Sequence, residues 1–282
     1  MFLTRTVGAS VLDFTVTRRG AQLISLSRGN TEFICANTPF WHYSTPTLFP
    51  IVGRLNADSY RFNGYTYRLN QHGFARERDF ICIDDQPLTY RLAYDNDTLK
   101  VYPFKFALTV SFRPMNNELI ITSRVQNLDE ELIWFSLGAH PALKVPFDGG
   151  RFEDYTLEFE REEHAQRIPL KDGLLTHERV ACLDGRTLPL SYDLFNDDAL
   201  IFDNLKSSQI SIRHGNRRVS IRANAPFWGI WTKRNAPFVC IEPWHGHADF
   251  TDFNGDFTQK HGILSLESGK SFSAQYSIIV DA

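Results

Sequence analysis

The stretch TPTLFPIVGRLNADSYRFNGYTYRLNQHGFAR, residues 45–76, decides how the rest of the chain is organised. Alternating aromatic residues in it flank Asn63-Gly64, a dipeptide that strongly favours the two-residue turn of a β-hairpin. We therefore predict a hairpin over residues 60–68. A rigid hairpin returns the chain, so we expect the segments on its two sides to lie close together.

The two segments that the hairpin joins carry Arg54 on one side and His72 and Arg76 on the other. One histidine and two arginines at one place suit an enzyme that acts on small polar or anionic molecules. They also suit a surface cluster held by neighbouring side chains. The rest of the sequence has to decide between these two interpretations.

Short alternating apolar segments, separated by turn residues, occur along the whole chain. Pro39 to Pro50 reads as an ordered loop, and residues 161–198 as the loosest part, with one short helix near 192–195. The predicted strands cover residues 11–17, 21–26, 32–35, 80–83, 89–93, 106–112, 118–125, 132–137, 155–160, 199–202, 209–213, 219–222, 227–232, 238–241, 263–266 and 271–280. Helical periodicity is almost absent, so we predict an all-β sandwich or barrel, and residues 1–282 contain no linker that would divide them into two domains.

Composition excludes several classes of protein. The apolar fraction of 43% is sufficient for a sizeable core, and 23 Phe, 10 Tyr and 5 Trp favour strands and stacking surfaces. A net charge of −3 without a basic block disfavours a nucleic-acid partner. No apolar run approaches the length needed to span a membrane, and the first ten residues lack the apolar core of a signal peptide.

The four cysteines are scattered without the spacing of a metal site, and most lie in apolar runs. This pattern is typical of reduced, buried thiols in a cytoplasmic protein. The cysteines are Cys35, Cys82, Cys182 and Cys240.

Three positions carry candidate acid–base chemistry. His72 is either a turn histidine packed on Phe74 or a site residue. His140 precedes Pro141, which removes a ladder donor, so its side chain is expected at a strand end, where it either faces a rim or pocket or has only a structural role. Glu242 follows the apolar strand 238–241 and should share a face with Cys240; a carboxylate there is costly unless it is paired or functional, and we favour function.

Two further features have competing interpretations. Trp231 and Trp244 are either core residues or flat faces on which a sugar stacks. The segment His245-Gly246-His247-Ala248-Asp249 contains three potential metal ligands, but we favour a solvated loop and predict no metal site. Fingerprints of nucleotide-binding and serine-hydrolase sites are absent.

The ordered set GR, QHGFAR, GAHPAL and CIEPWHGHAD resembles the aldose 1-epimerase (galactose mutarotase) family, and most closely its LacX-like branch, in which LFPIVGR- and HGFAR-like segments occur. The resemblance covers nearly the whole chain. It implies a single-domain, galactose-mutarotase-like β-supersandwich with its site in the cleft of a curved sheet. It departs from galactose mutarotases where GAHPAL replaces the N-H-[TS]-Y-F-N pattern, so the resemblance does not imply galactose as the substrate.

The resemblance also implies roles. Matched motif to motif, Glu242 resembles the family's catalytic base, His140 its acidic histidine and His72 its other substrate-site histidine. Arg54 and Arg76 resemble arginines at the sugar site. Asp198 is a candidate for the family's sugar-binding aspartate, which has no other counterpart here, and Trp231 offers a sugar-stacking face.

These residues predict a cofactor-independent isomerase that interconverts the α and β anomers of an aldose by acid–base ring opening. Two alternatives stay open: the same reaction on a hexose 6-phosphate, with Arg54 and Arg76 as an anion clamp, and a carbohydrate-binding protein without turnover. In each case we expect a sugar or sugar phosphate as the partner, a cytoplasmic location, and a monomer or homodimer.

Overall fold

The computed structural model describes residues 4–8 and 11–281. Strands dominate this part of the chain, and every pair of named strands is antiparallel. The prediction of an all-β fold is confirmed.

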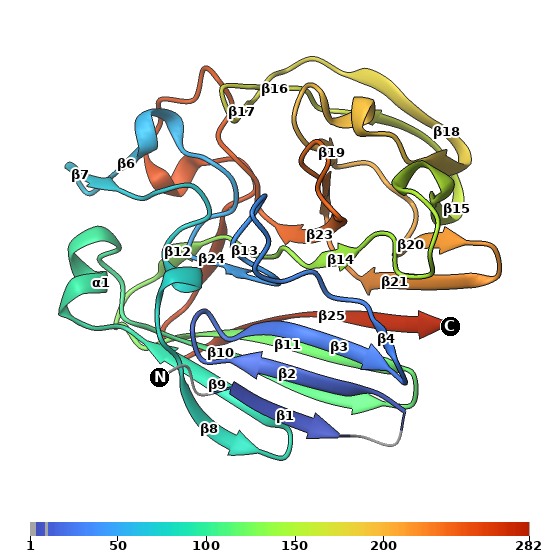
Figure 1. The fold of residues 1–282 in the computed structure, drawn as a ribbon. Coiled ribbons are helices and arrows are strands. Elements are labelled where there is room, and N and C mark those ends of the chain that lie inside the picture. Colours follow the sequence, from blue (N-terminus) through green and yellow to red (C-terminus); the bar gives the residue numbers. More distant parts are fainter. Residues whose placement is uncertain (1–3, 9–10, 282) are drawn as a thin grey trace.

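A four-stranded and a nine-stranded sheet form a sandwich; strands β1 to β4 and β8 to β11 lie in the lower half of Figure 1, and the nine-stranded sheet continues to β15 and β18 at the upper right. Phe14 of β2 stacks on Phe112 of β10, with ring centroids 6.4 Å apart, so the four-stranded sheet packs on one half of the nine-stranded sheet. The four-stranded sheet is formed by β1 (Thr4–Gly8), β2 (Asp13–Thr17), β3 (Gln22–Arg28) and β4 (Thr31–Glu32). The nine-stranded sheet is formed, in spatial order, by β18 (Val180–Pro189), β15 (Thr156–Arg167), β20 (Gln209–His214), β21 (Arg217–Ala223), β25 (Ser271–Asp281), β11 (Glu118–Asn127), β10 (Phe106–Met115), β9 (Leu88–Ala93) and β8 (Ile81–Asp85).

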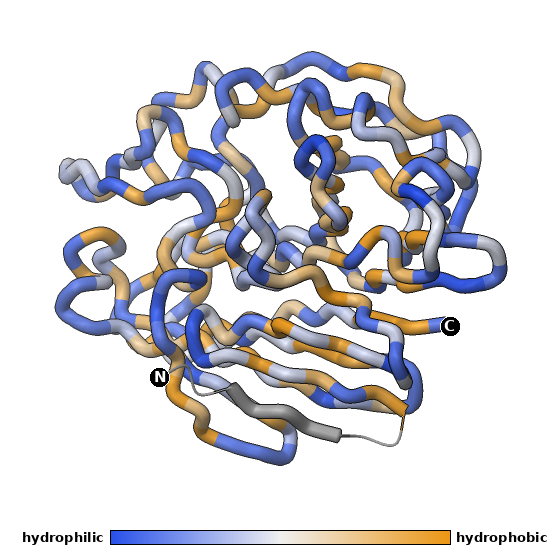
Figure 2. The backbone as a smooth tube through the Cα atoms, in the orientation of Figure 1, coloured by the Kyte–Doolittle hydropathy of each residue, from blue (hydrophilic) through white to orange (hydrophobic). Residues whose placement is uncertain are grey.

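Apolar and polar residues alternate along these strands, which Figure 2 shows as alternating colours on the tube. In β2, for example, Phe14 and Val16 are buried and Asp13 is exposed. A period of two buries one face of each strand in the core and leaves the other to solvent or to a second layer.

A third sheet lies in the middle of the molecule and carries Glu242 on its strand β23 (Figure 1). His245 of this sheet packs on Phe272 of β25 with ring centroids 5.2 Å apart, so the sheet lies against the nine-stranded one. Its strands are β19 (Leu200–Phe202), β22 (Phe227–Trp231), β23 (Phe238–His245), β13 (Leu137–Ala139) and β5 (Thr47–Leu48), with β14 (Ala142–Lys144) also paired to β23. Six of the eight residues of β23 have apolar side chains and nearly all are buried, as expected for a strand enclosed on both faces.

The predicted hairpin is present. It consists of β6 (Ser59–Phe62) and β7 (Tyr65–Arg68), and Asn63 and Gly64 both have positive φ, as the two-residue turn requires. The other small sheets pair β12 (Ile133–Phe135) with β24 (Leu264–Leu266) and β16 (Leu170–Lys171) with β17 (Leu174–Leu175). The predicted turn of helix at Tyr192–Phe195 is also present, as a 3-10 turn.

Two predictions from the sequence were wrong. Residues 161–198 are not the loosest part, because β15 continues to Arg167 and pairs with β18 across two register shifts. β18 is an edge strand with mostly exposed or half-buried side chains, so it lacks the apolar alternation that reveals inner strands. Helix α1 (Asn96–Val101) was missed, although Asp95 and Thr98 form a capping box at its start.

None of the helices in the described part of the chain is long and apolar enough to cross a membrane. All four cysteines are free.

Candidate active site

One strand, β23, organises the site. β13 pairs Gly138 with Trp244 and β14 pairs Ala142 with Cys240, so both flank the same side of β23. The register places His140, at the break between β13 and β14, opposite Glu242. Pro141 has no backbone N–H for the ladder, which explains why the pairing is interrupted here and the histidine can face the carboxylate.

The two side chains meet in a nearly dry environment. His140 Nε2 lies 3.2 Å from Glu242 Oε2, and the side chains are only 8% and 2% exposed. Both line a cavity of about 610 Å³, together with His72. We expected four residues, Arg54, His72, His140 and Glu242, to share one cleft, and the last three of them do so.

Burial opposes charge on both members of the pair. It raises the pKa of Glu242 well above its ordinary value, and the carboxylate of Asp198 adds to this, while the Trp244 indole and Arg76 act in the opposite direction. Burial, with the positive charge of Arg76, lowers the pKa of His140 to about 3. The pair therefore favours one proton in total, with the carboxyl protonated and the imidazole neutral.

His72 lies in the loop that follows the β6–β7 hairpin, and backbone hydrogen bonds to Gly53 fix its position. Its Nδ1 accepts a hydrogen bond from the Gly53 amide at 3.1 Å, and its own amide donates to the Gly53 carbonyl at 2.9 Å. The proton of the neutral ring therefore sits on Nε2. Burial lowers the pKa of His72 well below its usual value, so the ring is held as a neutral N–H donor.

This loop is tight. His72 and Gly73 both have positive φ, and a Cβ on Gly73 would lie 2.3 Å from the Phe49 carbonyl oxygen. The amides of Phe74 and Ala75 donate to that same carbonyl. Glycine is required at position 73 because the backbone turns back against residue 49 without room for a side chain.

Aromatic rings form the walls of the cavity. Trp41 stacks on His140 with ring centroids 4.6 Å apart, and Trp231 meets the same imidazole edge-on at 5.9 Å. Trp244 is 4% exposed and lies against Gly229, where a Cβ would come within 2.4 Å of the indole. Trp231 and Trp244 therefore both line the cavity, as the stacking interpretation expects. Sequence reasoning missed Trp41, although it belongs to a run of four aromatic side chains, Phe40 to Tyr43, inside a proline-bounded loop.

The two arginines differ. Arg76 lines the cavity; its guanidinium lies 4.5 Å above the Tyr43 ring and donates to the Gln71 carbonyl at 2.8 Å. Arg54 does not line it, which differs from the expectation of a shared cleft. The Arg54 guanidinium donates to both carboxylate oxygens of Asp58, at 2.8 and 2.9 Å, and both side chains are half-exposed. This bidentate pairing holds the Arg54 side chain outside the cavity.

Asp198 lies at the cavity wall, is exposed, and has a φ of 76°. Its Oδ1 accepts a hydrogen bond from the Ala199 amide. The sequence placed it as a candidate sugar ligand, and its position allows that role.

The segment from His245 to Asp249 is not the solvated loop that we expected. His247 and Asp249 are buried, and each has another partner: His247 Nε2 contacts His261 Nδ1 at 2.7 Å, and Asp249 binds Lys260 Nζ at 2.8 Å. His245 faces the nine-stranded sheet instead. The three potential ligands thus have separate surroundings and do not form a metal site together.

The buried pair Asp249–Lys260 supports the His72 loop indirectly, through the neighbouring segment 53–56. Asp249 Oδ2 accepts from the Asn56 amide at 2.9 Å, and the Asp249 amide donates to the Arg54 carbonyl. These bonds hold the segment that contains Gly53, the residue that orients His72.

Comparison with known proteins supports this description. The chain matches the family model for aldose 1-epimerase over residues 4–265. The chain belongs to the aldose 1-epimerase family. It is 31% identical over 274 residues to the chromosomal LacX protein of Lactococcus lactis, covering 89% of this chain and 91% of that protein.

Solved structures of the family share the fold. A galactose mutarotase related enzyme from Lactobacillus acidophilus is 37% identical, with a TM-score of 0.94 over 99% of this chain and 98% of its own. A galactose mutarotase-like protein from Lactobacillus casei is 28% identical, with a TM-score of 0.92 over 99% of this chain and all of its own. The galactose-mutarotase-like β-sandwich predicted from the sequence is therefore confirmed.

Replacing Lys260 by Met should strongly destabilise the protein, because it leaves the Asp249 carboxylate buried without its partner. We expect the free energy of unfolding to fall by about 3–5 kcal/mol, measured by urea denaturation. The double variant Lys260→Met with Asp249→Asn should lose less, since no unpaired charge remains. Lys100→Met, which breaks the exposed pair with Asp97, is the matched control and should change stability little. Equal losses for Lys260→Met and Lys100→Met would contradict this view of the pair.

Proposed function

We propose that this protein is an aldose 1-epimerase that interconverts the α and β anomers of an aldose by acid–base catalysis. The observation that carries the proposal is the 3.2 Å approach of His140 Nε2 and Glu242 Oε2 at the wall of an aromatic-lined cavity. An acid and a base so close together can serve the two neighbouring oxygens of a sugar's anomeric centre, the hydroxyl oxygen and the ring oxygen.

The reaction follows from these positions. Glu242 takes the proton from the anomeric hydroxyl while His140 gives a proton to the ring oxygen, the C1–ring-oxygen bond breaks, and the open aldehyde forms. Rotation about C1–C2 and reclosure on the other face invert the centre. His72 donates its Nε2–H to a sugar oxygen and stabilises charge that develops there, while Trp41 and Trp231 offer faces for the ring.

The shifted pKa values suit the open-chain stage. Ring opening leaves Glu242 protonated and His140 neutral, which is the distribution that burial favours. Closure from either face then needs the proton to pass back from Glu242 to the aldehyde oxygen. The same pair thus serves both directions of a nearly thermoneutral reaction.

Magnetisation-exchange NMR or polarimetry on a panel of aldoses tests the proposal directly. At least one aldose should exchange anomers much faster with catalytic amounts of protein than without it. Saturable sugar binding with no acceleration for any member of the panel would instead establish a carbohydrate-binding protein on this scaffold.

Single substitutions of the acid and base should each reduce turnover by roughly a hundred- to ten-thousandfold, the usual value of positioned proton transfer. The variants are Glu242→Gln and His140→Asn. Because both groups act on one ring-opening event, the double variant should lose far less than the product of the single losses. Sugar binding should persist, since His72 and Arg76 remain.

The matched control for this series is His245→Asn on the same strand, whose ring faces Phe272 rather than the cavity. Its exchange rate should stay close to wild type. Near-wild-type exchange in Glu242→Gln would remove Glu242 as the base and make Asp198 the first replacement to try.

The pH dependence of kcat/KM should be a broad bell. Its acidic limb should report the pKa of His140 and its basic limb the pKa of Glu242, the reverse of the usual order for a carboxylate base and a histidine acid. The pKa of Glu242 is raised and that of His140 is lowered, so the pair holds one proton at every pH between these two values. Within this pH range, the form with Glu242 ionised and His140 protonated is a constant fraction of the protein. Activity should fall in acid only well below the usual histidine range, near the pKa of about 3 of His140. It should fall in base as the raised pKa of Glu242 is passed. An acidic limb at the ordinary histidine pKa would contradict the assignment.

Hexose 6-phosphates are the second candidate substrates, because Arg76 lines the cavity and has no carboxylate partner within salt-bridge distance among the described residues. We favour neutral aldoses, since Arg54 is held outside by Asp58 and a two-arginine clamp is therefore not formed. Neutral sugars should be turned over at least as efficiently as their 6-phosphates. Arg76→Ala should raise KM for the sugar by roughly tenfold, the value of one charge-assisted hydrogen bond.

Arg54→Ala is the matched control, and KM should not change. The opposite outcome is clear-cut. A strong preference for a 6-phosphate that disappears in Arg76→Ala would show that the phosphorylated sugar is the substrate.

A further inference from the structure

A third side chain stands beside the acid and the base. Cys240 precedes Glu242 by two positions on β23, so the two side chains point to the same face. One ligand atom from each of His140, Cys240 and Glu242 lies within 4.8 Å of the other two, and all three residues are buried. The proposed reaction uses only two of these groups and gives the thiol no part.

The carboxylate is not satisfied within this cluster. Among the described residues, Glu242 Oε2 has no hydrogen-bond partner, although it is only 3.2 Å from His140 Nε2. A buried polar oxygen without a partner is costly, and a bound cation is one way to satisfy it. Here the atoms around it are a ring nitrogen and a sulfur, both of which bind metals.

The spacing fits a tetrahedral zinc ion. With ordinary zinc–ligand bond lengths, tetrahedral angles place a nitrogen and an oxygen ligand about 3.3 Å apart, and a nitrogen and a sulfur ligand about 3.6 Å apart. The observed nitrogen–oxygen separation is 3.2 Å, and the Cys240 sulfur lies within 4.8 Å of both of these atoms, so it would move toward them when the ion binds. Three protein ligands leave the fourth position open toward the cavity, which His140 and Glu242 line and through which an ion can enter.

The mixed donor set selects the kind of metal. Mg²⁺ and Ca²⁺ prefer oxygen ligands alone. A thiolate, an imidazole and a carboxylate together suit a borderline-soft divalent ion such as Zn²⁺ or its spectroscopic substitute Co²⁺.

We propose that His140, Cys240 and Glu242 form an inhibitory site for one Zn²⁺ ion per chain. The bound ion occupies the lone pairs of both the acid and the base and lies where the anomeric oxygens would sit. It therefore competes with sugar. Binding of the metal stands on the cluster alone, whereas inhibition rests on the function proposed above.

Titration of the chelator-treated protein with Co²⁺ tests the binding. We expect one tetrahedral Co²⁺ per chain with a thiolate-to-cobalt charge-transfer band, displaced by Zn²⁺. The band should vanish both in Cys240→Ala and in Cys240→Ser. Two variants are used so that a folding defect in one of them does not prevent the test. Zinc affinity measured by calorimetry should fall at least about tenfold in both.

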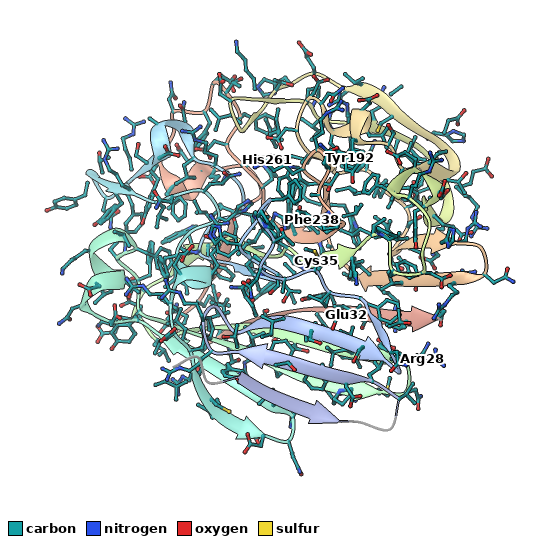
Figure 3. The ribbon with its side chains drawn as sticks, viewed as in Figure 1. Arg28, Glu32, Cys35, Tyr192, Phe238 and His261 are labelled. Atoms are coloured by element: carbon teal, nitrogen blue, oxygen red, sulfur yellow. The ribbon has the colours of Figure 1, made fainter. Side chains whose placement is uncertain are left out.

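Cys35→Ala is the matched control, because Cys35 belongs to the same buried apolar cluster as Cys240 and Phe238 (Figure 3 labels Cys35 and Phe238) but not to the ligand group. It should retain the band. A wild-type protein that binds no Co²⁺, or a Cys240→Ala variant that keeps the band and the zinc affinity, would overturn the proposal.

The activity arm uses the aldose that exchanges fastest. Zn²⁺ should inhibit the wild type competitively, excess chelator should restore full exchange, and Cys240→Ala should keep its basal rate while needing at least about tenfold more Zn²⁺ for half-inhibition. Undiminished exchange at saturating Zn²⁺ would overturn the inhibition. If no aldose is turned over, the proposed function fails, and the cobalt titration still decides the metal site.

Discussion

The structure depends on one interrupted strand pairing. β13 and β14 pair with the same side of β23 and together act as one interrupted strand. Pro141 separates them because it has no backbone N–H to donate to the ladder. The interruption frees His140 from regular pairing, yet the pieces on both sides hold it in register with Glu242. His140 and Glu242 thus lie on neighbouring segments of a buried sheet, where packing determines their separation. Positions on such rigid elements are more exact than positions on loops.

The dry surroundings explain the electrostatics of the pair. Water stabilises both a carboxylate and an imidazolium. Its exclusion therefore raises the pKa of Glu242 and lowers that of His140, so that the order of the two values is reversed. Around this pair, the Gly53 amide fixes the tautomer of His72, and the Asp249–Lys260 pair holds the chain that supplies this amide. The support of the cavity wall therefore extends from His72 to the buried charge pair Asp249–Lys260.

Much of the fold and part of the site could be predicted from the sequence. Inner strands, the Asn63-Gly64 hairpin and the His140-Pro141 break are local signals, and Glu242 is conspicuous because its strand is otherwise apolar. The rest depends on partners distant in the chain. Asp58 draws Arg54 outward, Lys260 and His261 draw the ligands of the 245–249 segment apart, and only the fold brings Trp41 onto His140. The edge strand β18 escaped detection because exposure on both faces removes its periodicity.

The indole of Trp244 gives the cavity wall its shape by occupying space that two strands leave empty. A Cβ at Gly138 would lie 2.7 Å from it and one at Gly229 only 2.4 Å, so neither neighbour can gain a methyl group while the tryptophan stays in place. The side-chain sizes at positions 138, 229 and 244, on β13, β22 and β23, therefore depend on one another. In the evolution of this family they are therefore expected to change together: a side chain at position 229 or 138 requires a smaller ring at 244, and the cavity would then have a different shape.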